Sequence, residues 1–182
     1  TAIWEKEVTT ILNKIENVKT GRIVLESIGA GVKWVAIERL LDANECNAHG
    51  GPRPQVKFGG VVKFNADVFH LGGRCVQMKN GPIHVHKPGQ RYDEVFFHEL
   101  IHARRGALGL RAPDAFTGGM FRFTNLEEFL AVLVTNVCIS DVTNKPSRFL
   151  RAGHTSHNVL ENSLSGSIAF YKVSTQAFAT ME

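Results

Sequence analysis

Residues 95–104 read VFFHELIHAR, and the two histidines in this stretch, His98 and His102, stand four positions apart. On an α-helix, residues at i and i+4 lie on the same face, so the two imidazoles would project side by side. Two imidazoles in that arrangement can hold one Zn²⁺ at about 2.0–2.1 Å each, with coordination positions left for a third ligand and a water. The spacing therefore predicts a zinc site on a helix.

Glu99 follows the first predicted ligand in this H-E-x-x-H pattern. At that position a carboxylate reaches water at the metal rather than the metal itself, and it is the natural general base for attack on a carbonyl. The surrounding residues favour a buried helix, because they are apolar: Val95, Phe96, Phe97, Leu100, Ile101 and Ala103. We therefore predict a catalytic role for Glu99.

A zinc ion held by two histidines needs a third protein ligand. Glu127 and Glu128 open a predicted helix, residues 126–139, which is almost wholly apolar after its first turn and should be buried. We favour Glu128, because Ala131 three positions later lets two helices approach closely, whereas Glu127 would point about 100° away. The alternative is that both carboxylates only complement the positive end of the helix dipole. Thr124 or Asn125 is the expected N-cap.

Hydrolysis also needs a hydrogen-bond donor facing the metal, to stabilise the oxyanion of the tetrahedral intermediate. His154, Tyr171 and Tyr92 are the candidates, and His154 is preferred. His154 and His157 are also rivals of the glutamates as third ligand. That arrangement is disfavoured, because extended motifs with a third histidine place it within six residues of the second one, and none occurs here before His154.

Two further helices are predicted from apolar periodicity in the first 30 residues. Residues 2–19 carry one apolar stripe, and Gly21 is the expected stop. A second, short helix over residues 22–27 is expected to bury Ile23 and Val24.

Strands are predicted between these helices and the motif. The predicted strands are residues 32–37, 60–69, 75–78 and 83–86, with a hairpin turn at Asn80-Gly81 between the last two. Trp34 is expected in the core. The polar, breaker-rich residues 42–54 predict a loop that leaves His49 in solvent.

Composition places the chain among ordinary globular proteins. Its 182 residues are 43% hydrophobic and 21% charged, which predicts a single domain over residues 1–182. Thr1 stands where a starting Met would be, which is consistent with a domain excised from a longer chain. The formal net charge of +4 comes without any basic run, so nucleic-acid binding is not indicated. A monomer is expected.

The cysteines and the apolar runs indicate the cellular compartment in which the protein works. Cys46, Cys75 and Cys138 are far apart and lack CxxC spacing, so the sequence predicts neither a disulfide framework nor a cysteine zinc site. This favours a reducing working compartment. No apolar run approaches 18 residues and no leader opens the chain, so neither a membrane span nor an ordinary secretory signal is predicted.

Taken together, the motif and the acidic helix resemble those of compact gluzincin-type zincins. Among these, the chain is most similar to the bacterial effector and toxin zinc metallopeptidases, a group that includes type III secreted effectors that cut host signalling proteins. The residues that carry the resemblance are HELIHA at 98–103, TGRIVLESI at 20–28, LEEFLAV at 126–132, and Phe149-Leu150-Arg151 followed by His154.

The resemblance implies an α+β fold with a small mixed sheet over the active-site helix and a following buried helix that bears the glutamate. It implies Zn²⁺, hydrolysis of peptide bonds in a protein or peptide substrate, and secretion or delivery into a target cell, where the enzyme would work in the cytoplasm. It also places an edge strand that binds extended substrate at residues 83–86, which is a stronger interpretation of His84 and His86 than metal binding.

Two other functions stay open. One is a zinc amidase toxin that acts on cell-wall crosslinks by the same chemistry. The other is a non-catalytic binding module with a structural zinc site, against which Glu99 counts, since a structural site needs no base.

Overall fold

The structure of the protein is a computed structural model, and it describes residues 2–31, 34–41, 48–53, 59–66, 89, 91–111, 123, 125–142 and 150–154. The described residues form four helices and one sheet. The helices are α1 (Ala2–Glu16), α2 (Lys19–Gly29), α5 (Tyr92–Leu108) and α6 (Leu126–Val142), and the strands are β1 (Val35–Arg39), β2 (Ala48–Pro52) and β3 (Gly60–Phe64). The predicted α+β class with a small mixed sheet is confirmed.

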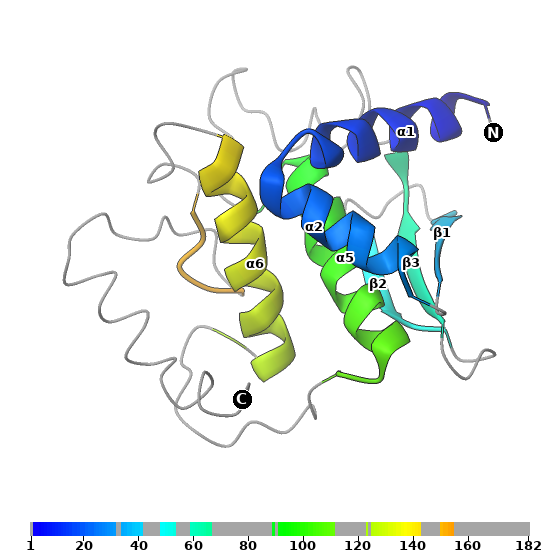
Figure 1. Ribbon diagram of the computed structural model, residues 1–182. Helices are drawn as coiled ribbons and strands as arrows, with labels where there is room; N and C mark the ends of the chain where they lie inside the picture. The colour runs from blue at the N-terminus through cyan, green and yellow to red at the C-terminus, as the bar shows by residue number, and fades with distance from the viewer. Residues whose placement is uncertain are drawn as a thin grey trace.

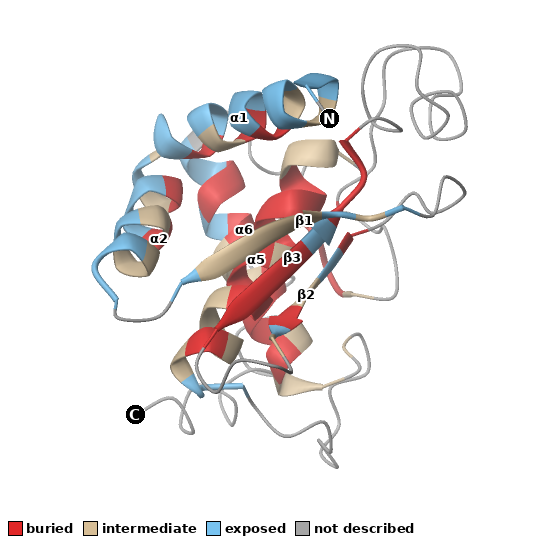
Figure 2. Cartoon of the chain, turned by 90° about the vertical axis from the view of Figure 1, so that its right-hand side faces the viewer, coloured by how far each residue is buried: buried red, intermediate tan, exposed pale blue. Residues whose placement is uncertain are grey.

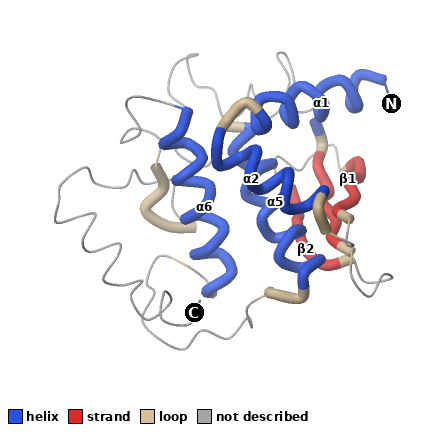
Figure 3. The backbone as a smooth tube through the Cα atoms, in the orientation of Figure 1, coloured by secondary structure: helices blue, strands red, loops and turns tan. Residues whose placement is uncertain are grey.

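α5 lies at the centre of these elements. The strand order is β1-β3-β2, with β3 parallel to β1 and antiparallel to β2. α5 packs against β2 and β3 on one side and against α6 on the other, while α1 and α2 contact it from a third direction (Figures 1 and 3). A residue on α5 can therefore face the sheet or the second long helix, depending on its position around the helix.

Glycines bring the sheet into direct contact with α5. A Cβ at Gly50 on β2 would lie 2.0 Å from the backbone oxygen of Glu99, and one at Gly60 on β3 would lie 2.1 Å from that of Ala103. From the helix side, a Cβ at Gly106 would lie 2.6 Å from the nitrogen of Pro52. Side chains at these positions would force the sheet and the helix apart. The glycines therefore allow the short distance between β2 and the motif on α5.

The core lies between the sheet and the helices. Phe64 of β3 and Phe96 of α5 are fully buried and meet edge to face, with ring centroids 5.3 Å apart. Figure 2 shows β3 and much of α5 buried, whereas the outward faces of α1 and α2 are exposed. The indole N–H of Trp4 donates to the Phe64 carbonyl oxygen at 2.9 Å and ties α1 to the sheet.

The first helical region differs from the prediction at its end. α1 stops at Glu16 and α2 starts at Lys19, so the predicted stop at Gly21 is wrong. Gly21 lies inside α2, where a Cβ would be 2.1 Å from the Ile15 carbonyl oxygen; its lack of a side chain permits the tight turn between the helices. Ile23 is 56% exposed rather than buried, because Gly21 and Val24 form the inward face of α2.

Two predictions at the sheet are also wrong. Trp34 is 47% exposed rather than in the core; it precedes β1, and the Arg53 guanidinium lies over its ring at 4.9 Å. The predicted loop over residues 42–54 contains the strand β2. Its Gly-Gly-Pro sequence is typical of a loop, but the close packing of β2 on α5 requires glycine. His49 is exposed as predicted, on that strand.

Other predicted features lie outside the described residues: the strands at 75–78 and 83–86, the turn at Asn80-Gly81, His84, His86, His157 and Tyr171. Among the helices of the described residues, none combines the length and apolar character that crossing a membrane requires.

Candidate metal centre

The H-E-x-x-H motif lies in the middle of α5, as predicted. His98 and His102 are 3% and 7% exposed, and their ring centroids are 4.8 Å apart. Their Nε2 atoms are separated by 3.1 Å. The helix continues through Gly106 and ends at Leu108, and the cap residue Gly109 has a φ of 70°, the left-handed conformation that favours glycine. The two imidazoles therefore direct their Nε2 atoms toward one point, on the face of α5 that packs against α6.

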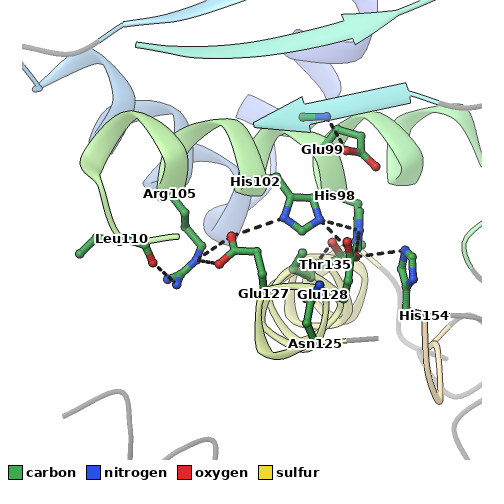
Figure 4. A network of polar contacts seen from close by, with 12 residues as sticks. His98, Glu99, His102, Arg105, Leu110, Asn125, Glu127, Glu128, Thr135 and His154 are labelled. Carbon is green, nitrogen blue, oxygen red and sulfur yellow. Dashed lines mark hydrogen bonds and ion pairs between the residues drawn. The ribbon is translucent and has the colours of Figure 1, made fainter. Parts of the chain in front are cut away.

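Glu128 reaches that point from α6. Its Oε2 lies 3.1 Å from His98 Nε2 and 3.2 Å from His102 Nε2 (Figure 4). Asn125, one of the two predicted N-caps, caps α6: its Oδ1 accepts a hydrogen bond from the Glu128 backbone N–H at 2.8 Å. The cap thus fixes the backbone of Glu128, whose carboxylate contacts both histidines.

Glu127 faces a different part of the same site. Its Oε1 lies 3.4 Å from His102 Nδ1, and the Arg105 Nε–H donates to both of its oxygens at 3.0 Å. Glu127 is 1% exposed. A carboxylate on the second ring nitrogen of a ligand histidine orients the ring and fixes its tautomer. Of the two glutamates, Glu128 is therefore placed to donate to an ion and Glu127 to hold His102.

His154 joins the same group from the segment that follows α6. Its Nε2 lies 3.0 Å from Glu128 Oε2. Its ring stacks on that of His98, with centroids 5.5 Å apart and planes 16° from parallel. Donor atoms of His98, Glu128 and His154 all fall within 4.8 Å of one another and could hold a metal ion. The predicted oxyanion donor therefore stands among the predicted ligands, as Figure 4 shows.

The spacing of the donor atoms fits an ion of the size of zinc. Donors 2.0–2.1 Å from a tetrahedral Zn²⁺ lie about 3.3 Å from each other. The separations found around Glu128 Oε2 are 3.0–3.2 Å, and the two motif Nε2 atoms are 3.1 Å apart. Imidazole nitrogen and carboxylate oxygen suit Zn²⁺, and they also suit other first-row metals. The residues present therefore fit a metal, without identifying which one.

The pKa values of the group define its charges. Burial lowers the pKa of His98 to about 4, so this ring is neutral at pH 7. Burial would also lower the pKa of His102, but its contacts with Glu127 and Glu128 outweigh burial and raise the pKa to about 9. Burial would raise the pKa of Glu128, but the two histidines lower it well below its usual range. Glu128 is thus ionised, and without a metal His102 carries the balancing charge.

Glu99 lies on the sheet side of α5. The backbone N–H of Gly50 on β2 donates to Glu99 Oε2 at 2.6 Å (Figure 4). Burial raises the pKa of the Glu99 carboxyl to about 7. The Gly50 N–H thus fixes the direction of the Glu99 carboxyl at the edge of β2, and the charges of His102 and Glu128 also act on this carboxyl.

Tyr92 is not brought into this group by its described contacts. Its hydroxyl contacts Lys14 Nζ on α1, and the same ammonium lies over its ring, 4.5 Å from the centroid. Of the two predicted oxyanion donors among the described residues, His154 and Tyr92, His154 lies beside the motif.

Sequence reasoning gave no role to Arg105, Gly50 or Asn136. Arg105 donates to Glu127, and the Gly50 backbone donates to Glu99. Asn136 is 6% exposed, and its side chain is bonded to the backbone of Arg151. An asparagine in the middle of an apolar helix is a usable signal, because a buried amide needs partners.

Scans against protein-family models, curated proteins and solved structures each found no match. The zincin resemblance therefore rests on the motif residues, and the metal centre on its geometry.

Proposed function

We propose that this protein is a zinc-dependent metallopeptidase whose ion is held by His98, His102 and Glu128. The observation that carries the proposal is the convergence of Glu128 Oε2, from α6, on the Nε2 atoms of two histidines from α5, at 3.1 and 3.2 Å. A carboxylate and two imidazoles from separate buried helices match the donor set of catalytic zinc sites with two histidines and a glutamate.

Zinc bound here would act as a Lewis acid that polarises a peptide carbonyl and acidifies water. His98 and His102 would hold the ion through Nε2, and Glu127 fixes the tautomer of His102 through Nδ1. Glu99 takes the proton of the attacking water and passes it to the leaving amine. The Gly50 N–H holds the Glu99 carboxylate at the edge of β2.

The substrate class belongs to the same proposal. The resemblance to secreted effectors and toxins supports a protein or peptide substrate in a target cell. A cell-wall amide would be cut by the same residues, so only the identity of the products separates a peptidase from an amidase.

A second candidate is a binding module with a structural zinc site. His154 favours it, because a fourth protein donor beside Glu128 is what closed, structural sites have. Glu99 favours the enzyme, since its carboxylate does not join the donor group and a structural site has no use for a base.

Mass spectrometry of proteomes incubated with the protein separates these functions. We expect new peptide N-termini with the wild type and none with Glu99→Gln, while both proteins bind one zinc per chain. Glu26→Gln, at the exposed surface of α2, is the matched control and should cleave like the wild type. Full cleavage by Glu99→Gln would exclude Glu99 as the base. Zinc binding without any cleavage would favour the structural site, and release of wall fragments instead of peptides would favour the amidase.

A further inference from the structure

Residues 150–154, which carry His154, are attached to α6 through the side chain of Asn136, in addition to the contact between Glu128 and the His154 ring. The Asn136 amide donates from Nδ2 to the Arg151 carbonyl oxygen at 3.0 Å, and its Oδ1 accepts from the Arg151 backbone N–H at 2.9 Å. One amide thus satisfies both backbone groups of Arg151, as a neighbouring strand would. Both residues are 6% exposed, so water does not compete for these bonds.

The Arg151 side chain extends the attachment to His154. Its guanidinium Nη2 donates to the His154 carbonyl oxygen at 2.7 Å, which closes the short segment on itself. Gly89 leaves room for this guanidinium: a Cβ there would lie 2.6 Å from Arg151 Nε, and the φ of Gly89 is 77°. A buried, enclosed arginine holds the backbone of His154 more rigidly than an exposed one would.

α6 therefore controls two members of the metal group. It carries Glu128 directly, and it carries His154 through Asn136, which lies about 12 Å further along the helix axis. The result is a His154 ring 3.0 Å from Glu128 Oε2 and stacked on His98.

We propose that Asn136 is a positioning residue that sets the His154 imidazole at the metal centre, with Arg151 as the link. The inference rests on the proposed metal site, but not on peptidase activity. It assigns Asn136 a role in a site that its own side chain does not touch.

Imidazole nitrogen NMR on the zinc-loaded, ¹⁵N-labelled chain tests the position of His154 directly. His154→Gln identifies the ring signals of His154. We expect Asn136→Ala to shift or broaden those signals while the signals of His98 and His102 stay in place. Ser140→Ala is the matched control, because it removes a hydroxyl that donates to the Asn136 carbonyl oxygen and leaves the amide intact. Unchanged His154 signals in a folded Asn136→Ala protein would overturn the proposal.

Arg151→Lys covers the case in which Asn136→Ala does not fold. It keeps the backbone bonds to Asn136 and removes the guanidinium bond to His154, so it should also displace the His154 signals. Unchanged signals in this variant would remove Arg151 as the link.

Zinc affinity separates positioning from a general loss of stability. Asn136→Ala should weaken zinc binding by about tenfold, and by less than about twofold when His154 is already Gln. Equal losses in both backgrounds would mean that Asn136 acts without His154. If the protein cleaves nothing and the His154 signals still follow Asn136, the peptidase proposal fails and the positioning role stands.

Discussion

Glu128 Oε2 lies 3.1 Å from His98 Nε2 although the two residues are 30 positions apart in the sequence. The contact joins the first turn of α6 to the middle of α5, and both side chains are placed by local features: helical spacing for the histidine and the Asn125 cap for the glutamate. Both donors thus lie on packed helices rather than on loops, and tight metal binding is favoured by ligands on such elements.

The two neighbouring glutamates should differ in their effect on zinc. Glu128→Gln removes the carboxylate at the histidines and should abolish stoichiometric zinc binding. Glu127→Gln only loosens His102 and should weaken the affinity by about 10- to 100-fold. Titration of each apoprotein with zinc against a competing chelator measures both. Equal affinities of the two variants would contradict the assignment of Glu128 as ligand.

Gly50→Ala should separate β2 from α5. Its Cβ would lie 2.0 Å from the Glu99 carbonyl oxygen, so the strand must move, and we expect a loss of about 1–3 kcal/mol in the free energy of unfolding. The shift also breaks the Gly50 N–H bond to Glu99 and should reduce cleavage. Gly29→Ala is the matched control: a Cβ there meets nothing within 4 Å, so denaturant unfolding should show unchanged or slightly higher stability.

Glu94 should make the protein less stable as pH rises toward neutral. Burial raises the pKa of this carboxyl to about 7, against hydrogen bonding from Gly89 and the charge of Arg151. Because the folded pKa lies above the unfolded one, the folded state holds the proton more tightly. This stability is complete below about pH 4.5 and is lost as pH rises to about 7.

Glu94→Gln isolates that contribution. The wild type should lose about 3 kcal/mol relative to Glu94→Gln between these pH values. Denaturant unfolding of the zinc-free proteins at a series of pH values measures the difference. Parallel stability curves for the two proteins would show that folding does not raise the pKa of Glu94.

Local sequence signals predicted the histidine and glutamate group better than the sheet. Helical spacing and apolar flanks located His98 and His102, and a cap with an apolar run located Glu128, because these features depend on neighbours in the chain. The strand β2 was missed, because Gly50 and Gly51 read as loop residues unless the close approach of α5 is known. Trp34 was misplaced for a similar reason, since its large apolar ring is stacked beneath Arg53 at the surface.

The contacts of Asn136 could not be predicted from neighbouring residues in the sequence. Its partner Arg151 lies 15 residues along the chain, and the pairing of a side-chain amide with a distant backbone leaves no periodic pattern. Likewise, the preference of Glu128 over Glu127 needed the packing of α6 on α5 before it could be tested.

The zinc content of purified wild type and His98→Ala tests the central claim most directly. Elemental analysis should find one zinc per chain in the wild type and almost none in His98→Ala, with both proteins folded by circular dichroism. A wild type that takes up no zinc, or a His98→Ala protein that retains all of it, would contradict a metal centre built on His98, His102 and Glu128.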